Sequence, residues 1–187
     1  MSVSTNDLKN GMTLELDGTL FSIIEFQHVK PGKGGAFVRT KLRNLRSGAV
    51  VERTFRAEEK VGLAILDRRG MQYLYREGET FVFMDLETFE QHHVPVGVAG
   101  DSGRYLADGM NATVAIYEGN AISVDLPASV TLSVSKTDPG VKGDRVSGAM
   151  KPATLETGVK IQVPLFVEEG DRVKVDTRSG EYLEREK

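Results

Sequence analysis

A single lysine, Lys33, lies between a proline and three glycines in the stretch KPGKGG. Pro31 restricts its own φ and favours an extended conformation at Lys30 before it. The glycines carry no side chain that could block the approach of a partner; they are Gly32, Gly34 and Gly35. An isolated exposed lysine contributes only about 0 to 1 kcal/mol to a contact with a phosphate or carboxylate. The rest of the protein must therefore position this amine.

Other chemistries fit these residues less well. A phosphate-binding loop needs GxxxxGK[ST] before a helix, whereas Lys33 is followed by Gly34 and a strand-like run. His28 stands alone, and the neighbours His92 and His93 would point to opposite faces of a strand. The chain has no Cys, and no Ser/His/Asp set stands out. We predict no catalytic residue, no metal site and no cofactor. An enzyme with Lys33 as nucleophile stays an alternative, weakened because no pocket is evident to desolvate the amine.

Charge is unevenly distributed along the chain. The net charge is −3, yet residues 1–64 carry ten Lys/Arg against seven Asp/Glu, and residues 65–187 carry fourteen against twenty. Within residues 28–56 the only acidic residue is Glu52. The basic residues there are Lys30, Lys33, Arg39, Lys41, Arg43, Arg46, Arg53 and Arg56. Such a patch on an acidic body would present one end to a polyanion. The alternative is a solvated sheet edge that resists aggregation.

Strand-like segments surround the lysine. Leu20–Val29 and Ala36–Leu42 flank the loop and predict a β-hairpin with Lys33 near its tip. The second segment alternates with period 2. One face would carry Val38, Thr40 and Leu42, and the other Arg39, Lys41 and Arg43. A second hairpin follows in Asn44–Phe55, with its turn at residues 46–48. The basic side chains are therefore expected to share a face.

The remaining sequence continues this β-rich pattern. An acidic residue followed by glycine precedes an extended run at four places, a hairpin signal because glycine supplies positive φ; these are Asp17, Glu77, Glu118 and Glu169. Short helical pieces are expected only around Arg56–Leu66 and in Asp101–Met110. Runs at this spacing favour small barrels. We predict an all-β chain with domains at residues 1–64, 65–127 and 128–187.

The N-terminus lacks a basic segment followed by an apolar one, and no run approaches the length of a membrane span. We therefore expect a cytoplasmic protein without a membrane partner.

Two motifs now carry a resemblance. VKPGKGGAFVRTKLRN resembles the domain I loop of bacterial elongation factor P, a family related to archaeal and eukaryotic factor 5A. The run KPATLETGVKIQVPLFVEEG is similar to the C-terminal signature of that family. The matching positions are Lys151, Ala153, Gly158, Val163, Pro164 and Gly170. The resemblance extends from STNDLKNGM to VDTRSGEYLER and so covers essentially the whole chain.

The resemblance implies an SH3-like (KOW-type) barrel followed by two OB-type barrels, in an elongated, tRNA-like L shape. It implies a monomeric factor, not an enzyme, that binds the 70S ribosome between the peptidyl-tRNA site and the exit site. There it would promote peptide-bond formation at consecutive prolines. Lys33 would reach towards the acceptor end of peptidyl-tRNA near the peptidyl-transferase centre. Many members modify this position, which implies a modifying enzyme as a further partner.

The resemblance also implies contacts elsewhere. Backbone contacts to tRNA and rRNA would come from Lys30, Arg39, Lys41 and Arg43. The small-subunit and codon side would use Gly143, Asp144 and Arg145, with Tyr182 and Arg185 at the same end. Ordinary turn chemistry and core packing are the alternatives for these five. A paralogue with another ribosomal role and a generic OB/SH3 RNA-binding module also stay open. The latter usually needs aromatic platforms, and the basic hairpin offers only Phe26 and Phe37.

Overall fold

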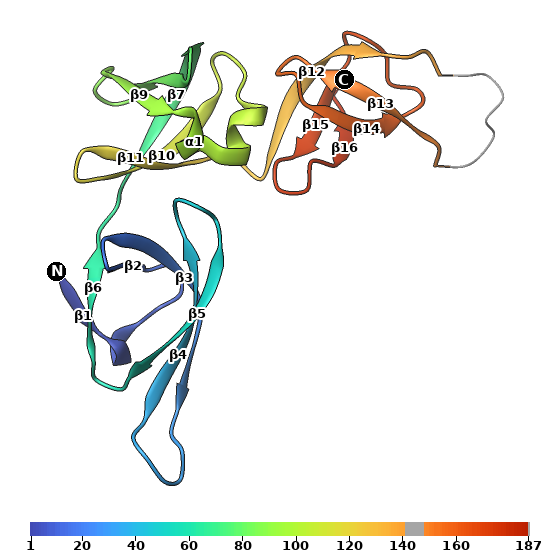
Figure 1. Ribbon diagram of the computed structural model, residues 1–187. Helices are drawn as coiled ribbons and strands as arrows, with labels where there is room; N and C mark the ends of the chain where they lie inside the picture. Colours follow the sequence, from blue (N-terminus) through green and yellow to red (C-terminus); the bar gives the residue numbers. More distant parts are fainter. Residues whose placement is uncertain (141–147, 187) are drawn as a thin grey trace. The chain divides into compact units, whose positions relative to one another are not determined.

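A computed structural model describes residues 1–140 and 148–186 of the chain, almost entirely as β-strands and their turns (Figure 1). The strands form one six-stranded and two five-stranded sheets. The chain divides into two compact units, Met1–Arg68 with Ala115–Ser123, and Arg69–Val114 with Val124–Lys187. Among the described residues, none of the helices is long and apolar enough to cross a membrane.

The first sheet has the order β1-β6-β2-β3-β4-β5. Its strands are β1 (Ser2–Ser4), β2 (Thr13–Leu16), β3 (Thr19–Val29), β4 (Phe37–Asn44), β5 (Val50–Arg56) and β6 (Lys60–Ala64), with the 3-10 turn η1 (Thr5–Asp7) after β1. Alternating apolar residues of these strands bury one face. The core contains Leu8, Leu14, Phe21, Ile23, Val38, Leu42, Phe55 and Val61. This core holds the long β3–β4 hairpin in place.

The second sheet has the order β11-β10-β7-β8-β9. Its strands are β7 (Asp67–Glu77), β8 (Thr80–Asp85), β9 (Gln91–Pro95), β10 (Asn111–Tyr117) and β11 (Asn120–Asp125). Between β9 and β10 lie the one-turn helix α1 (Val96–Ala99) and the 3-10 helix η2 (Gly100–Tyr105). Large apolar side chains of β7 and β8 are buried, among them Met71, Phe81 and Phe83. The sheet is thus built around consecutive hairpins.

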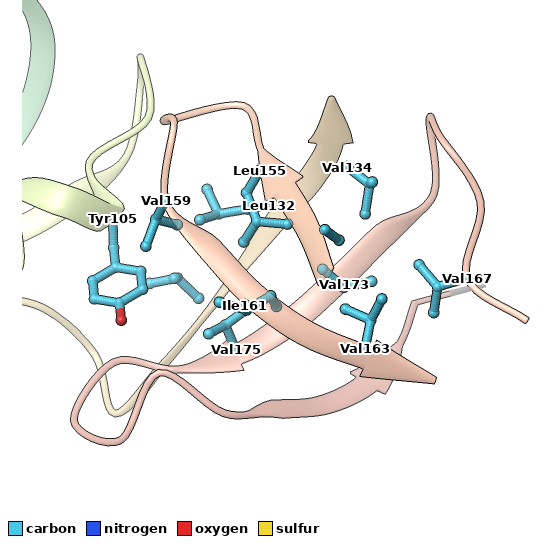
Figure 2. Close-up of a cluster of buried hydrophobic side chains, with 12 residues drawn as sticks. Tyr105, Leu132, Val134, Leu155, Val159, Ile161, Val163, Val167, Val173 and Val175 are labelled. Carbon is cyan, nitrogen blue, oxygen red and sulfur yellow. The ribbon is translucent and has the colours of Figure 1, made fainter. Parts of the chain in front are cut away.

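The third sheet has the order β14-β13-β12-β15-β16. Its strands are β12 (Ser129–Thr137), β13 (Met150–Leu155), β14 (Lys160–Pro164), β15 (Arg172–Asp176) and β16 (Tyr182–Arg185). Valines and other branched aliphatic side chains fill the space between these strands, and Tyr105 of η2 lies at one end of the cluster (Figure 2). Branched residues suit a pleated, tightly packed interior.

One of the two expected short helical pieces is wrong, and the other is confirmed in part. Arg56–Leu66, expected as a helical turn, contains the strand β6, in which Val61 is buried in the first core and Ala64 is also buried. Packing of the first sheet overrides weak helical propensity there. The expected piece Asp101–Met110 overlaps the 3-10 helix η2, which ends at Tyr105, has no side-chain cap and is followed by a turn at residues 108–109.

Candidate nucleic-acid interface

Lys33 lies in a loop, residues 30–36, between β3 and β4, and the loop projects from the first sheet (Figure 1). Its residues from Lys30 to Gly35 are all exposed. The base of the loop is closed by the pairing of Val29 with Phe37 and by the N–H of Ala57, which donates to the carbonyl of Ala36 at 3.0 Å. The base is therefore fixed to the sheet, while the tip makes an accessible amine.

The glycines act as expected from the sequence. Gly34 has φ +113°, a conformation that other residues rarely adopt. A Cβ added at Gly32 or Gly35 would meet nothing within 4 Å, so these two positions are open on the side where a side chain would project. At the base of the loop, Lys30 contributes to the wall of a cavity of about 450 Å³. The loop thus combines one turn-forming glycine with two unobstructed ones.

Strand β4 separates buried from basic side chains as the alternation predicts. Val38 and Leu42 are completely buried, and Thr40 is 1% exposed, its hydroxyl donating to the carbonyl of Arg53 at 2.8 Å. The intervening side chains point outwards and are exposed; they are Arg39, Lys41 and Arg43. We call this outer side of β3, β4 and β5 the basic face. These three cations lie on a strand that is paired on both sides, which favours a fixed geometry for contacts to a phosphate backbone.

The three cations that β4 contributes to the basic face have different neighbours. Lys41 lies directly between Glu25 of β3 and Glu52 of β5. The corresponding neighbours of the two arginines are neutral: Gln27 and Thr54 beside Arg39, and Ser22 and Val50 beside Arg43. Side chains directly opposite one another in a sheet are about 5 Å apart at Cβ. The charge of Lys41 is therefore partly compensated, whereas the arginines face neutral side chains.

A bulge in β3 creates this arrangement. The register between β3 and β4 shifts between Ile23 and Glu25. Before the shift Ile23 is buried, and after it Phe26 instead packs against the core. Glu25 consequently turns to the outer side beside Lys41. Sequence reasoning missed this carboxylate. It counted Arg56 in the basic patch but did not place it on a face; Arg56 pairs with Phe37 at the end of the basic face nearest the Lys33 loop. Period-2 alternation along β5 could have predicted that position.

Comparison with known proteins supplies the context. Residues 4–61 match the elongation factor P (EF-P) KOW-like domain, residues 66–124 the elongation factor P (EF-P) OB domain, and residues 130–185 the family described as elongation factor P, C-terminal. A relative named elongation factor P in Acidothermus cellulolyticus is 59% identical over 182 residues, covering 97% of each chain. Its namesake in Moorella thermoacetica is 56% identical, covering 98% of this chain and 99% of the relative. The chain belongs to the elongation factor P family.

Solved structures agree with this membership. The protein titled eukaryotic translation initiation factor 5A from Methanococcus jannaschii is 29% identical, with a TM-score of 0.55 over 67% of this chain and 94% of that one. A factor 5A family protein from Naegleria fowleri, 16% identical with a TM-score of 0.53, shares the fold. The all-β fold with KOW-like and OB-type domains is thereby confirmed. Membership of the elongation factor P family supports a role as a translation elongation factor.

The candidate residues of the third sheet divide into two groups. Gly143, Asp144 and Arg145 lie outside the described residues. Tyr182 is partly buried against the third core. Arg185 is exposed, with its guanidinium 5.1 Å above the ring of Phe166 and its Nη1 3.3 Å from Asp171 Oδ2. The pKa of Asp171 is lowered, first by the backbone N–H of Glu168 and further by Arg185. Both residues therefore make contacts within the C-terminal part of the chain, and their role at the small subunit stays a prediction.

The family signature in β13 and β14 forms part of the third core. Ala153 and Val163 are buried. Lys151 is only 6% exposed, and its Nζ donates a hydrogen bond to the carbonyl of Asp138 at the end of β12. A buried ammonium is costly unless it is hydrogen-bonded, so the lysine of the signature ties neighbouring segments of the sheet together. No group of three His, Asp or Glu side chains within residues 1–140 and 148–186 is arranged to hold a metal ion.

Proposed function

We propose that the chain binds the ribosome between the peptidyl-tRNA and exit sites and positions peptidyl-tRNA with the Lys33 loop, promoting peptide-bond formation at consecutive prolines. The observation that carries this proposal is the exposed Lys33 at the tip of a projecting, glycine-rich loop whose base adjoins the basic face. Membership of the elongation factor P family gives that arrangement its target.

The chemistry required of the chain is positional. Proline is a rigid and poor reactant, and correct alignment of reactants can contribute up to about 7 to 11 kcal/mol to a bimolecular step. Arg39 and Arg43 would hold phosphates of the tRNA, which fixes orientation without reading sequence. The fixed base of the loop would then place Lys33 near the reacting acceptor end. The ribosome supplies the catalysis, and the factor itself is not an enzyme.

Translation of a reporter with a run of prolines, in cell-free ribosomes with and without the protein, tests this function. We expect a higher yield of full-length product with the protein and no difference for a reporter without the run. Equal yields on the proline reporter would refute the proposal. If ribosome binding were retained at the same time, the result would point to a paralogue with another ribosomal role.

Alanine variants of Lys33 and Lys30 distinguish the contribution of the amine at the loop tip from that of the loop's positive charge. We expect Lys33→Ala to abolish most of the gain on the proline reporter, while Lys30→Ala, which removes the same charge at the loop base, retains much of it. Equal loss in the two variants would mean that net charge, not a positioned amine, carries the activity.

The chemical state of Lys33 is a separate proposal. We propose that a modifying enzyme extends this amine, because the exposed tip is accessible to such an enzyme. The intact mass of the protein from its native host, followed by the mass of the peptide that contains Lys33, tests this. An excess mass on that peptide is expected; a mass equal to the sequence would show that the bare lysine acts.

A further inference from the structure

The same six-residue turn occurs once in each of the three sheets. It begins at Asn44, at Asp85 and at Asp176, each the last residue of its strand. In every case the first N–H donates to the carbonyl of the sixth residue, and the fifth N–H donates back to the first carbonyl. The three sequences are NLRSGA, DLETFE and DTRSGE. One local structure therefore recurs with three different surfaces.

Side-chain bonds within the turn also recur. The side-chain oxygen of the first residue accepts the N–H groups of the third and fourth residues, as Asx turns do. These distances are 2.8 and 3.0 Å at Asn44, 2.8 and 3.0 Å at Asp85, and 2.7 and 2.9 Å at Asp176. The hydroxyl of the fourth residue, Ser or Thr, accepts the sixth N–H at 3.2 to 3.4 Å. The backbone needs of the turn are thus met identically in all three.

The turn in the second sheet differs at its fifth position. In the turns of the first and third sheets this position is a glycine with a positive φ, +73° at Gly48 and +73° at Gly180. In the turn between β8 and β9 it is Phe89, with φ +60°. A bulky side chain is disfavoured in this conformation. Folding of the turn therefore gives no reason for phenylalanine, because glycine forms the same turn elsewhere in the chain.

Packing gives no reason for it either. Phe89 is 69% exposed, and Leu86 in the same turn is 40% exposed. Two apolar side chains at the tip of a hairpin are thus presented to solvent, one of them at a strained position. Strained residues and exposed aromatic residues are both enriched at functional contacts. A binding partner that buries Phe89 accounts for the strain, the exposure and the choice of residue together.

Charge identifies the kind of partner. The third position of the turn is Arg46 in the first sheet and Arg178 in the third, but Glu87 in the second. Glu90 follows Phe89 and is also exposed, and residues 86–90 contain no Lys or Arg. The nearby Arg69 is paired with Asp85 at 3.3 Å. The carboxylates of Glu87 and Glu90, which flank Phe89 in the sequence, repel phosphates and attract cationic side chains. An RNA surface is therefore disfavoured.

We propose that the turn of residues 85–90 docks on a basic protein of the ribosome, with Phe89 in an apolar recess and Glu87 and Glu90 against cationic side chains at its rim. This contact would lie on a different sheet from the Lys33 loop and would add a protein contact to the RNA contacts of the basic face. It rests on the proposed ribosome binding.

Site-specific photocrosslinking tests the proposal directly. The full chain with p-benzoylphenylalanine in place of Phe89 is incubated with ribosomes stalled at a proline run, irradiated, and separated into protein and RNA fractions. We expect the crosslink on one basic protein. A crosslink on rRNA, or none while the factor still sediments with ribosomes, would overturn the inference. Failure of the unsubstituted chain to sediment with ribosomes would refute the proposed function and this inference with it.

Affinity measurements with matched variants provide a second test. Phe89→Gly introduces the residue found at this position in the other two turns, so we expect an unchanged or higher melting temperature. Because the variant loses the aromatic anchor, we expect its dissociation constant for ribosomes to rise about tenfold or more. Phe89→Tyr should retain binding, and Glu87→Arg should weaken it. Thr88→Ser introduces the serine of the other two turns and leaves Phe89 unchanged; it is the control and should bind ribosomes with wild-type affinity. Wild-type affinity of Phe89→Gly would contradict the proposal.

Discussion

The unequal neighbours of the three β4 cations on the basic face lead to a quantitative prediction about ribosome binding. Lys41 lies between Glu25 and Glu52, whereas Arg39 and Arg43 face neutral side chains. For an ammonium and a carboxylate that come within about 5 Å of each other, the attraction is roughly 0.8 kcal/mol per carboxylate in water. Screening at about 0.1 M salt leaves roughly 1 kcal/mol for the two together. An exposed lysine gains only about 0 to 1 kcal/mol from one phosphate, so Lys41 gains little by leaving its carboxylates.

We therefore expect the arginines, and not Lys41, to account for the salt dependence of binding. Each phosphate contact contributes about 0.7 to 0.9 to the slope of log K against log [salt]. Arg39→Ala and Arg43→Ala should each lower that slope by about this amount. When KCl rises from about 50 to about 200 mM, each arginine variant should therefore lose about threefold less affinity than the unsubstituted protein does. Lys41→Ala should change the slope much less. The measurement is equilibrium binding to ribosomes carrying peptidyl-tRNA, at constant Mg²⁺.

The reverse experiment releases Lys41. In Glu25→Gln/Glu52→Gln the lysine keeps its place but loses both compensating charges, so we expect the slope to rise by about one contact. Asp7→Asn/Asp101→Asn changes the net charge equally at exposed positions on other elements and is the control. Equal slopes for all three single variants, together with no effect of the double Glu variant, would refute the argument from register.

Two further predictions concern stability. The pKa of Asp176 lies below its usual 3.8, chiefly because the carboxylate accepts the N–H of Ser179. The stabilisation by the ionised Asp176 is therefore present above that pH and is lost as pH falls through the lowered pKa. Asp176→Asn keeps the accepting oxygen and should make the free energy of unfolding in urea less dependent on pH below about 4; an unchanged pH dependence would contradict this. A Cβ at Gly62 would lie 2.7 Å from the carbonyl oxygen of Glu15, so Gly62→Ala should lower the free energy of unfolding by about 1 to 3 kcal/mol. Gly35→Ala is the control: its added Cβ would meet nothing within 4 Å, and the free energy of unfolding should change by less than about 0.5 kcal/mol.

The strand pattern on either side of Lys33 could be predicted because period-2 alternation is a property of consecutive residues. Val38 and Leu42 are buried and Arg39 is exposed, as that period requires. The bulge before Glu25 could not be predicted, because it depends on how two strands pair and leaves no clear local signal. The cross-strand partners of each cation therefore came only from the structure.

Charged residues show the same limit. Lys151 lies within the region that matches the C-terminal family model. A lysine is expected on the surface, and only the structure shows that this one is buried, with its ammonium hydrogen-bonded to the carbonyl of Asp138. The predicted domain boundaries and the roles of Gly143, Asp144 and Arg145 stay predictions. Tyr182 packs against the third core, as its core-packing alternative predicts, and its role at the small subunit, like that of Arg185, stays a prediction.

The recurring turn also makes the molecule convenient for spectroscopy. The chain contains no cysteine. The third residue of the turn contributes only its backbone to the turn's hydrogen bonds, and it is exposed at Arg46 and at Arg178. The double variant Arg46→Cys/Arg178→Cys would therefore carry one exposed thiol in the turn of the first sheet and one in the turn of the third. A donor and an acceptor dye at these sites would leave the Lys33 loop, the basic face and the Phe89 turn unlabelled. The separation of the two sheets, free and on the ribosome, then becomes a quantity that energy transfer can follow in real time during translation of a proline run.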